Sequence, residues 1–96
     1  MRERRGAEIL RSVAANVRRI RERQGLSQEA LAEQADLDVR AVQRVEQGKI
    51  NFGVVVLVLL AAALGVSPAR LLRPATLERR LRGRPLTKAP AARRRG

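Results

Sequence analysis

The chain has 96 residues, no Cys and no His, one aromatic residue (Phe52) and a formal net charge of +12. Without Cys or His the chain cannot form disulfides, use His- or Cys-based catalysis, or bind zinc through its usual ligands. With one aromatic residue it cannot bind single-stranded nucleic acid by stacking several bases on aromatic side chains. The positive charge favours a polyanionic partner such as nucleic acid. Because no apolar run follows the charged N-terminus, we predict no secretory signal and expect a cytoplasmic location.

Three helices are predicted in the first half of the chain. Between residues 7 and 23 apolar residues recur at helical spacing, with Arg and Glu on the other faces. Ser27 is a predicted N-cap for a helix over Gln28–Ala35, and Asp38 is a predicted N-cap for a helix over Val39–Gln47. The last two helices are short and amphipathic, and three residues separate them. This pattern is typical of a DNA-reading helix-turn-helix.

The apolar run over residues 53–66 has three interpretations. A transmembrane helix needs about 20 apolar residues, so the run is too short to span a bilayer. A β-strand would have no second strand to pair with. An eleven-residue buried helix over Val54–Leu64, ended by Gly65, fits the length and the spacing. Ser67 and Pro68 then start a short fifth helix, so the sequence predicts an all-α fold of five short helices.

The composition changes after the fifth predicted helix. We assign residues 7–73 to one folded domain and residues 74–96 to a mostly disordered basic tail rich in Arg and Pro. Residues 77–96 contain eight Lys or Arg and one Glu, which is more than half of the net charge. Within the tail, Leu77–Leu81 are expected to form at most a transient helical turn. The tail is expected to add sequence-neutral, salt-dependent affinity for DNA.

Three stretches carry a resemblance to a known family. Residues 17–32 contain Val-Arg-Arg-Ile-Arg and Gln-Gly-Leu-Ser-Gln-Glu-Ala-Leu-Ala, residues 37–49 read Leu-Asp-Val-Arg-Ala-Val-Gln-Arg-Val-Glu-Gln-Gly-Lys, and residues 57–72 keep a matching apolar pattern. Together they resemble the phage-repressor-like (lambda repressor/Cro, Xre) helix-turn-helix family, which implies a five-helix lambda-repressor-like DNA-binding domain. The chain departs from the family at Asp36, where Gly is usual, and at Phe52-Gly53, where Pro-Ser is common.

The resemblance places the third predicted helix in the major groove. Its inward positions are Val42 and Val45, and the outward, base-reading positions are Val39, Arg40, Gln43 and Arg44. Arg40 and Arg44 are four residues apart and therefore share one stripe, from which each can pair with guanine O6 and N7. The alternative interpretation is an ordinary solvated helix face.

Three further residues are predicted contacts to DNA phosphate. Gln28 lies in the first turn of its helix, where backbone N–H groups favour anions. Lys49 follows the third helix, and Arg18 lies on the first helix. For Gln28 and Arg18 the alternative is a solvated surface position. The resemblance further implies that Arg21 and Glu46 form a partly buried structural salt bridge.

An apolar stripe on the fourth predicted helix suggests a partner. With the core face assigned, helical spacing leaves four apolar residues on the opposite side, which are Val55, Leu59, Ala62 and Val66. Exposed contiguous apolar surface usually marks an interface, so we predict a homodimer through this stripe. The alternative is that the tail folds back over it, with Leu77 and Leu81 as lids.

These features predict a sequence-specific double-stranded DNA-binding transcriptional regulator, a repressor that acts as a dimer on a palindromic operator. An alternative is the antitoxin of a toxin–antitoxin pair, which binds a toxin and its own promoter. A third is a nonspecific nucleoid or RNA-binding protein. We expect no enzyme activity, no cofactor, no metal and no membrane association.

Overall fold

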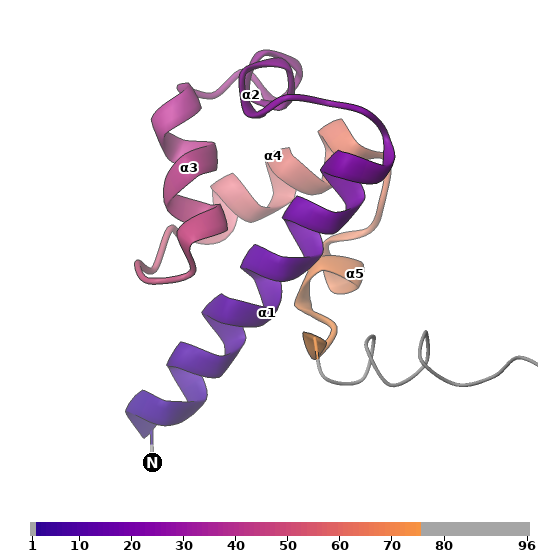
Figure 1. Cartoon of the computed structure of the whole chain (residues 1–96). Coiled ribbons are helices and arrows are strands. Elements are labelled where there is room, and N and C mark those ends of the chain that lie inside the picture. The colour runs from indigo at the N-terminus through magenta and orange to yellow at the C-terminus, as the bar shows by residue number, and fades with distance from the viewer. Residues whose placement is uncertain (1, 76–96) are drawn as a thin grey trace, which may run out of the picture.

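The computed structural model describes residues 2–75, and all regular structure among them is helical (Figure 1). The predicted bounds of the second, third and fourth helices are confirmed. The predictions for Leu77–Leu81 and for the rest of the tail beyond residue 75 lie outside the described residues. The helices are α1 (Arg2–Arg23), α2 (Gln28–Ala35), α3 (Val39–Gln47), α4 (Val54–Leu64) and α5 (Pro68–Leu72).

Side chains at the helix starts explain why the short helices begin where they do. The Ser27 hydroxyl accepts a hydrogen bond from the Ala30 N–H at 3.0 Å, and the Ser67 hydroxyl accepts one from the Arg70 N–H at 3.2 Å. At α3, Asp38 Oδ1 accepts from the backbone N–H of the second helical residue at 2.8 Å. Each cap satisfies a donor that has no partner within its helix, which fixes the first turn.

Helix α1 begins at Arg2, five residues before the predicted start at Ala7. The segment before Ala7 reads Arg-Glu-Arg-Arg-Gly and has no apolar periodicity, so the pattern that predicted the helix is missing there. Arg and Glu nevertheless have good helix propensity, and they extend the helix without a core contact. Arg4 and Arg5 on this extension are exposed.

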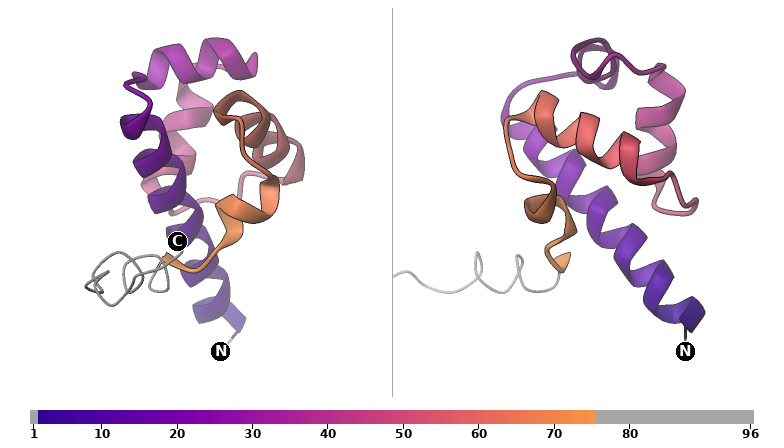
Figure 2. Two further views of the ribbon diagram at one scale, coloured as in Figure 1. Left: turned by 90° about the vertical axis from the view of Figure 1, so that its right-hand side faces the viewer. Right: turned by 180° about the vertical axis from the view of Figure 1, so that it is seen from behind.

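Helix α1 forms the centre of the fold and contacts α3, α4 and α5. Helix α2 packs on α3 and α4, and Figure 2 shows α4 crossing α1 while α5 lies beside α1. All five helices contribute to one hydrophobic core. Its buried members include Val13, Val17, Ile20, Leu31, Val42, Val45, Leu57, Leu60, Leu64 and Leu71. Within residues 2–75, no helix is both long enough and apolar enough to cross a membrane.

A buried polar residue that the sequence analysis did not identify ties α5 to α1. Asn16 is 0% exposed, and its Nδ2 donates to the carbonyl oxygens of Leu71 at 2.9 Å and Arg73 at 2.8 Å. Its Oδ1 accepts from Arg19 Nη2 at 2.9 Å. These bonds satisfy carbonyls at the end of α5, which a helix as short as α5 leaves unpaired.

The turns on either side of α3 use left-handed backbone. Asp36 has φ 58° and ψ 45° and ends α2, as expected for the residue that replaces the family's Gly. Gly48 ends α3 with φ 70°. A Cβ added to Gly48 would lie 3.2 Å from Ala14 Cβ and 3.4 Å from Arg11 Cα, so the end of α3 approaches α1 more closely than a larger residue allows.

Candidate nucleic-acid interface

A buried ion pair holds α3 against α1. Arg21 Nε lies 2.7 Å from Glu46 Oε2, and Arg21 Nη2 lies 3.1 Å from Glu46 Oε1. Arg21 Nη1 also donates to the Leu26 carbonyl at 2.7 Å. The hydrogen bond to Glu46 and the charge of that carboxylate raise the pKa of Arg21, against the opposing effect of burial. The salt bridge expected from the family resemblance is present.

Gln28 belongs to the same hydrogen-bond network. Its side chain is half-buried, and its Nε2 donates to Glu46 Oε1 at 3.0 Å. This amide is therefore engaged within the protein, and it links the first turn of α2 to α3. A phosphate contact by Gln28 stays a prediction, and it would use the second N–H of its side-chain amide or the nearby backbone N–H groups as donors.

The exposed edge of α3 carries three of the four predicted base-reading residues. Arg40 and Arg44 are exposed, and Gln43 is half-buried beside them. Val39 is half-buried and packs against the hydrophobic core, so it contributes less to the exposed edge than predicted. Helix α3 presents two arginines and one amide, which are the side chains that pair with guanine and adenine edges in a major groove.

Arg40 makes a local contact that the sequence analysis did not anticipate. Its Nη2 lies 3.3 Å from Asp38 Oδ2, and its Nε lies 3.4 Å from Asp38 Oδ1. Hydrogen bonds from the Arg40 side chain and backbone lower the pKa of Asp38, and the same pairing raises the pKa of Arg40. The pairing engages Nε and one Nη2 hydrogen of Arg40 and leaves its Nη1 hydrogens for a base contact.

Two of the three predicted phosphate-contact residues line one pocket beside α3, and the third follows the end of that helix. Arg18 and Gln28 line a shallow open pocket between α1, α2 and α3, together with Gln43, Glu46 and Gln47. Arg18 is exposed, and its Nε lies 3.5 Å from Glu22 Oε2. Lys49 is exposed just after the C-terminal end of α3 and does not line this pocket. The fold therefore brings Arg18, Gln28 and Gln43 together in one pocket.

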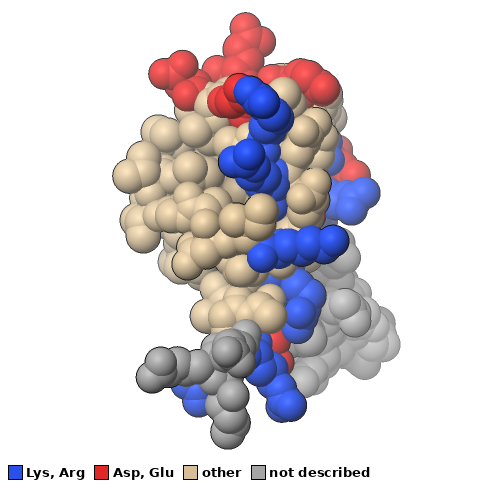
Figure 3. Space-filling view, turned by 90° about the vertical axis from the view of Figure 1, so that its left-hand side faces the viewer, with Lys and Arg blue, Asp and Glu red and all other residues tan. Residues whose placement is uncertain are grey.

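Charge is separated on the face that carries α3. In Figure 3 basic side chains run in a column from α3 towards the N-terminal end of α1, whereas acidic side chains gather at the end that carries α2. The acidic residues exposed there include Glu29, Glu33 and Asp36. The basic column offers a path for a phosphate backbone along α3, and the acidic end disfavours one.

The apolar stripe on α4 differs in part from its prediction. Val55 is 71% exposed and Ala62 is exposed, but Leu59 and Val66 are half-buried and pack against the core. The reason is that α2, α5 and α1 all contact α4, which makes its buried arc wider than one face. The most exposed large apolar residues on α4 are Val54, Val55 and Val58.

The exposed residues Val54 and Val58 of α4 were not predicted from helical periodicity. Val54 is 73% exposed and Val58 is 45% exposed, whereas the prediction treated neither as part of the stripe. The helical angles of Val54 and Val58, at 100° per residue, are compatible with exposed positions. The packing of α2 and α5, however, decides which half of the α4 surface stays exposed, and the sequence of α4 does not reveal that side. In Figure 3 this surface without charge lies beside the basic column.

Comparisons with known proteins agree with this arrangement. A helix-turn-helix family model matches residues 17–71, which extend from the middle of α1 through most of α5. A crystal structure described as a hypothetical transcription factor from Neisseria has a TM-score of 0.71 and 36% sequence identity, and the match covers 79% of this chain and 87% of that chain. No curated protein matches the chain. The chain belongs to the phage-repressor-like (Xre) helix-turn-helix family.

Proposed function

We propose that this protein is a transcriptional regulator that binds double-stranded DNA in a sequence-specific manner. The observation that carries the proposal is the exposed edge of α3. Arg40, Gln43 and Arg44 face outward there, while the buried Arg21–Glu46 pair fixes the helix on the body of the domain. The similar structure from Neisseria is itself described as a hypothetical transcription factor.

We infer a repressor role from the exposed edge of α3, which would lie in the major groove of the bound site. Binding would regulate by steric occlusion, because a protein seated in the major groove of a promoter excludes polymerase. Val39 packs against the core beside this edge, where its remaining exposed surface suits contact with a thymine methyl group.

Selection of bound sites from random duplexes tests the proposal. The purified protein should enrich one motif over unselected DNA, and a scrambled version of that motif should compete poorly. Equal competition by scrambled DNA would show a nonspecific nucleic-acid-binding protein instead. Expression of a reporter downstream of the selected motif then distinguishes repression from activation.

We also propose that the protein acts as a homodimer through the exposed part of α4. Val54, Val55, Val58 and Ala62 form a contiguous apolar surface, and Ile50 is 50% exposed just before the helix. Such a surface favours association with a second copy, which would present two α3 helices to the half-sites of a palindromic operator.

Sedimentation of the purified protein tests the dimer. Wild type should sediment as a dimer and Val58→Glu as a monomer, because a charge in the interface would be desolvated on association. Ile9→Glu provides a matched control, since Ile9 is 51% exposed on α1 and lies outside the proposed interface. A monomeric wild type, or dissociation by the control substitution alone, would contradict this interface.

A further inference from the structure

A basic stripe runs along α1 and extends N-terminal of residues 17–71, the segment that matches the family model. Arg4, Arg11 and Arg18 are seven residues apart along the 22-residue helix α1. Seven residues make nearly two turns, so the three side chains leave one face of the helix and extend about 20 Å along its axis. All three are exposed.

This stripe lies on the same side of the molecule as α3. Gly48, the last residue before Lys49, approaches α1 so closely that an added Cβ would lie 3.4 Å from Arg11 Cα. Lys49 therefore leaves α3 next to the stripe. In Figure 1 the N-terminal end of α1 and the α3–α4 connection lie on the same side, and in Figure 3 the basic column continues from α3 to that end of α1.

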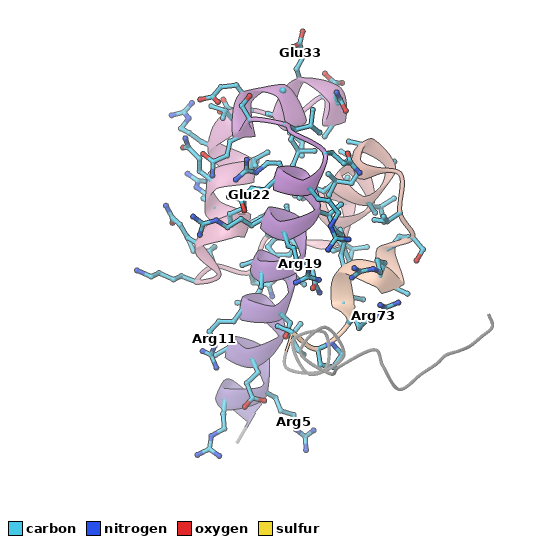
Figure 4. The ribbon with its side chains drawn as sticks, turned by 45° about the vertical axis from the view of Figure 1, so that its right-hand side comes forward. Arg5, Arg11, Arg19, Glu22, Glu33 and Arg73 are labelled. Carbon is cyan, nitrogen blue, oxygen red and sulfur yellow. The ribbon has the colours of Figure 1, made fainter. Side chains whose placement is uncertain are left out.

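Another arginine of the same helix segment points elsewhere. Figure 4 shows Arg11 on the α3 side of α1 and Arg5 on the other side of the helix. Arg5 lines a separate groove with Glu8, Ile9, Ser12, Leu72 and Pro74. Arg5, an exposed arginine on the side of α1 away from α3, is therefore a matched control for Arg11 on the α3 side.

One arginine of the stripe, Arg18, pairs with an acidic residue among the described side chains, and the other two do not. Arg18 lies 3.5 Å from Glu22, and both side chains are more than half exposed, so a phosphate can replace this weak pairing. Among the residues whose side chains the structure describes, Arg4 and Arg11 form no ion pair. Their guanidinium groups are thus available for a phosphate, which they can bind through two hydrogen bonds.

We propose that Arg4 and Arg11 contact the phosphate backbone of the duplex beside the base pairs faced by α3, so that the N-terminal half of α1 extends the protein's footprint on DNA. This inference rests on the proposed DNA-binding function. The partner is a duplex backbone because α3 and the stripe form one basic column. Contacts of this kind position the protein and add affinity without reading sequence.

The salt dependence of binding tests the inference. Wild type, Arg4→Ala, Arg11→Ala and the control Arg5→Ala are titrated onto one duplex of arbitrary sequence over a range of KCl concentrations. Each phosphate contact contributes about 0.9 to the slope of log affinity against log salt. Arg4→Ala and Arg11→Ala should each lower the slope by about this amount, whereas Arg5→Ala should leave it close to wild type. Ala is the strongest helix former, so α1 is retained, which far-UV circular dichroism verifies.

Hydroxyl-radical footprinting on a selected site provides a second readout. Arg11→Ala should lose backbone protection at the edge of the footprint and keep the protection around the bases read by α3. Unchanged slopes and footprints for both variants would overturn the inference and leave the proposed function intact. The inference also fails if Arg5→Ala lowers the slope equally, because the effect would then come from the net positive charge of α1 and not from contacts by Arg4 and Arg11. A wild-type protein that binds no duplex at low salt would overturn both proposals.

Discussion

Arg21 on α1 and Glu46 on α3 are joined at two points, with Nε–Oε2 at 2.7 Å and Nη2–Oε1 at 3.1 Å. The two side chains are only 11% and 5% exposed. Because Glu46 also accepts from Gln28, the pair connects α1, the start of α2 and α3. The position of the exposed edge of α3 therefore depends on a polar network behind it, in addition to the apolar contacts of Val42 and Val45.

We predict strong coupling between Arg21 and Glu46 in a double-mutant cycle. Arg21→Met or Glu46→Leu alone leaves a buried charge without its partner and should lower the free energy of unfolding by about 3 kcal/mol. The double variant should lose much less than the sum of the two, because no uncompensated charge remains. Urea denaturation measures all four proteins, and additive losses would show that the pair is not coupled.

The stability of the domain should depend on Asp38 at acidic pH. Hydrogen bonds from Arg40 lower the pKa of Asp38 from its ordinary value of 3.8, so the folded state binds this proton less readily than the unfolded state. The resulting stabilisation is fully present above the ordinary pKa and is lost as the pH falls through the lowered folded value. Thermal unfolding from neutral pH to pH values below 3.8 should show this loss.

Asp38→Asn is the matched control for that pH dependence. Asn is an equally good N-cap but has no titrating carboxyl, so the acid-dependent part attributable to residue 38 should disappear. The substitution also releases Arg40 and removes a negative charge beside the DNA-facing edge. Affinity for duplex DNA should therefore rise, most clearly at low salt. An affinity that falls would indicate that Asp38 must hold Arg40 in place for binding.

Asp36→Gly should stabilise the turn between α2 and α3. The left-handed backbone at Asp36, with φ 58°, is strained for a residue with a Cβ and natural for Gly. The free energy of unfolding should rise by about 1 kcal/mol. This gain is the relief of backbone strain less the cost of the greater conformational freedom of Gly in the unfolded chain. Asp36→Asn separates strain from charge, since it removes only the carboxylate that lies unfavourably at the C-terminus of α2. If Asn alone gives the full gain, charge and not backbone strain is the cause.

Local sequence signals predicted most of the fold. Ser27, Asp38 and Gly65 mark helix ends through caps and left-handed positions, and these effects depend on one or two residues, which explains why the bounds of α2, α3 and α4 are correct. The start of α1 was placed too late because its charged first turns lack apolar periodicity. The helix propensity of Arg and Glu, together with continuity with the packed part of α1, accounts for these turns.

Features that depend on tertiary packing were harder to predict. Leu59 and Val39 are half-buried because neighbouring helices cover more than one face of α4 and α3, which periodicity along a single helix does not reveal. The hydrogen bonds of Asn16 join segments 55 and 57 residues apart and leave no local pattern. By contrast, the Arg21–Glu46 pair was expected from the family resemblance and not from spacing.

The most direct test of the account compares Arg44→Ala with Lys49→Ala on a site selected by the wild-type protein, with affinities measured for every single-base variant of that site. We predict that Arg44→Ala costs about 1–3 kcal/mol of binding free energy on the selected site and loses discrimination at one base pair. Lys49→Ala should weaken binding equally on every variant, as a phosphate contact does. If Arg44→Ala also weakens all variants equally, α3 does not read sequence through Arg44, which contradicts the account.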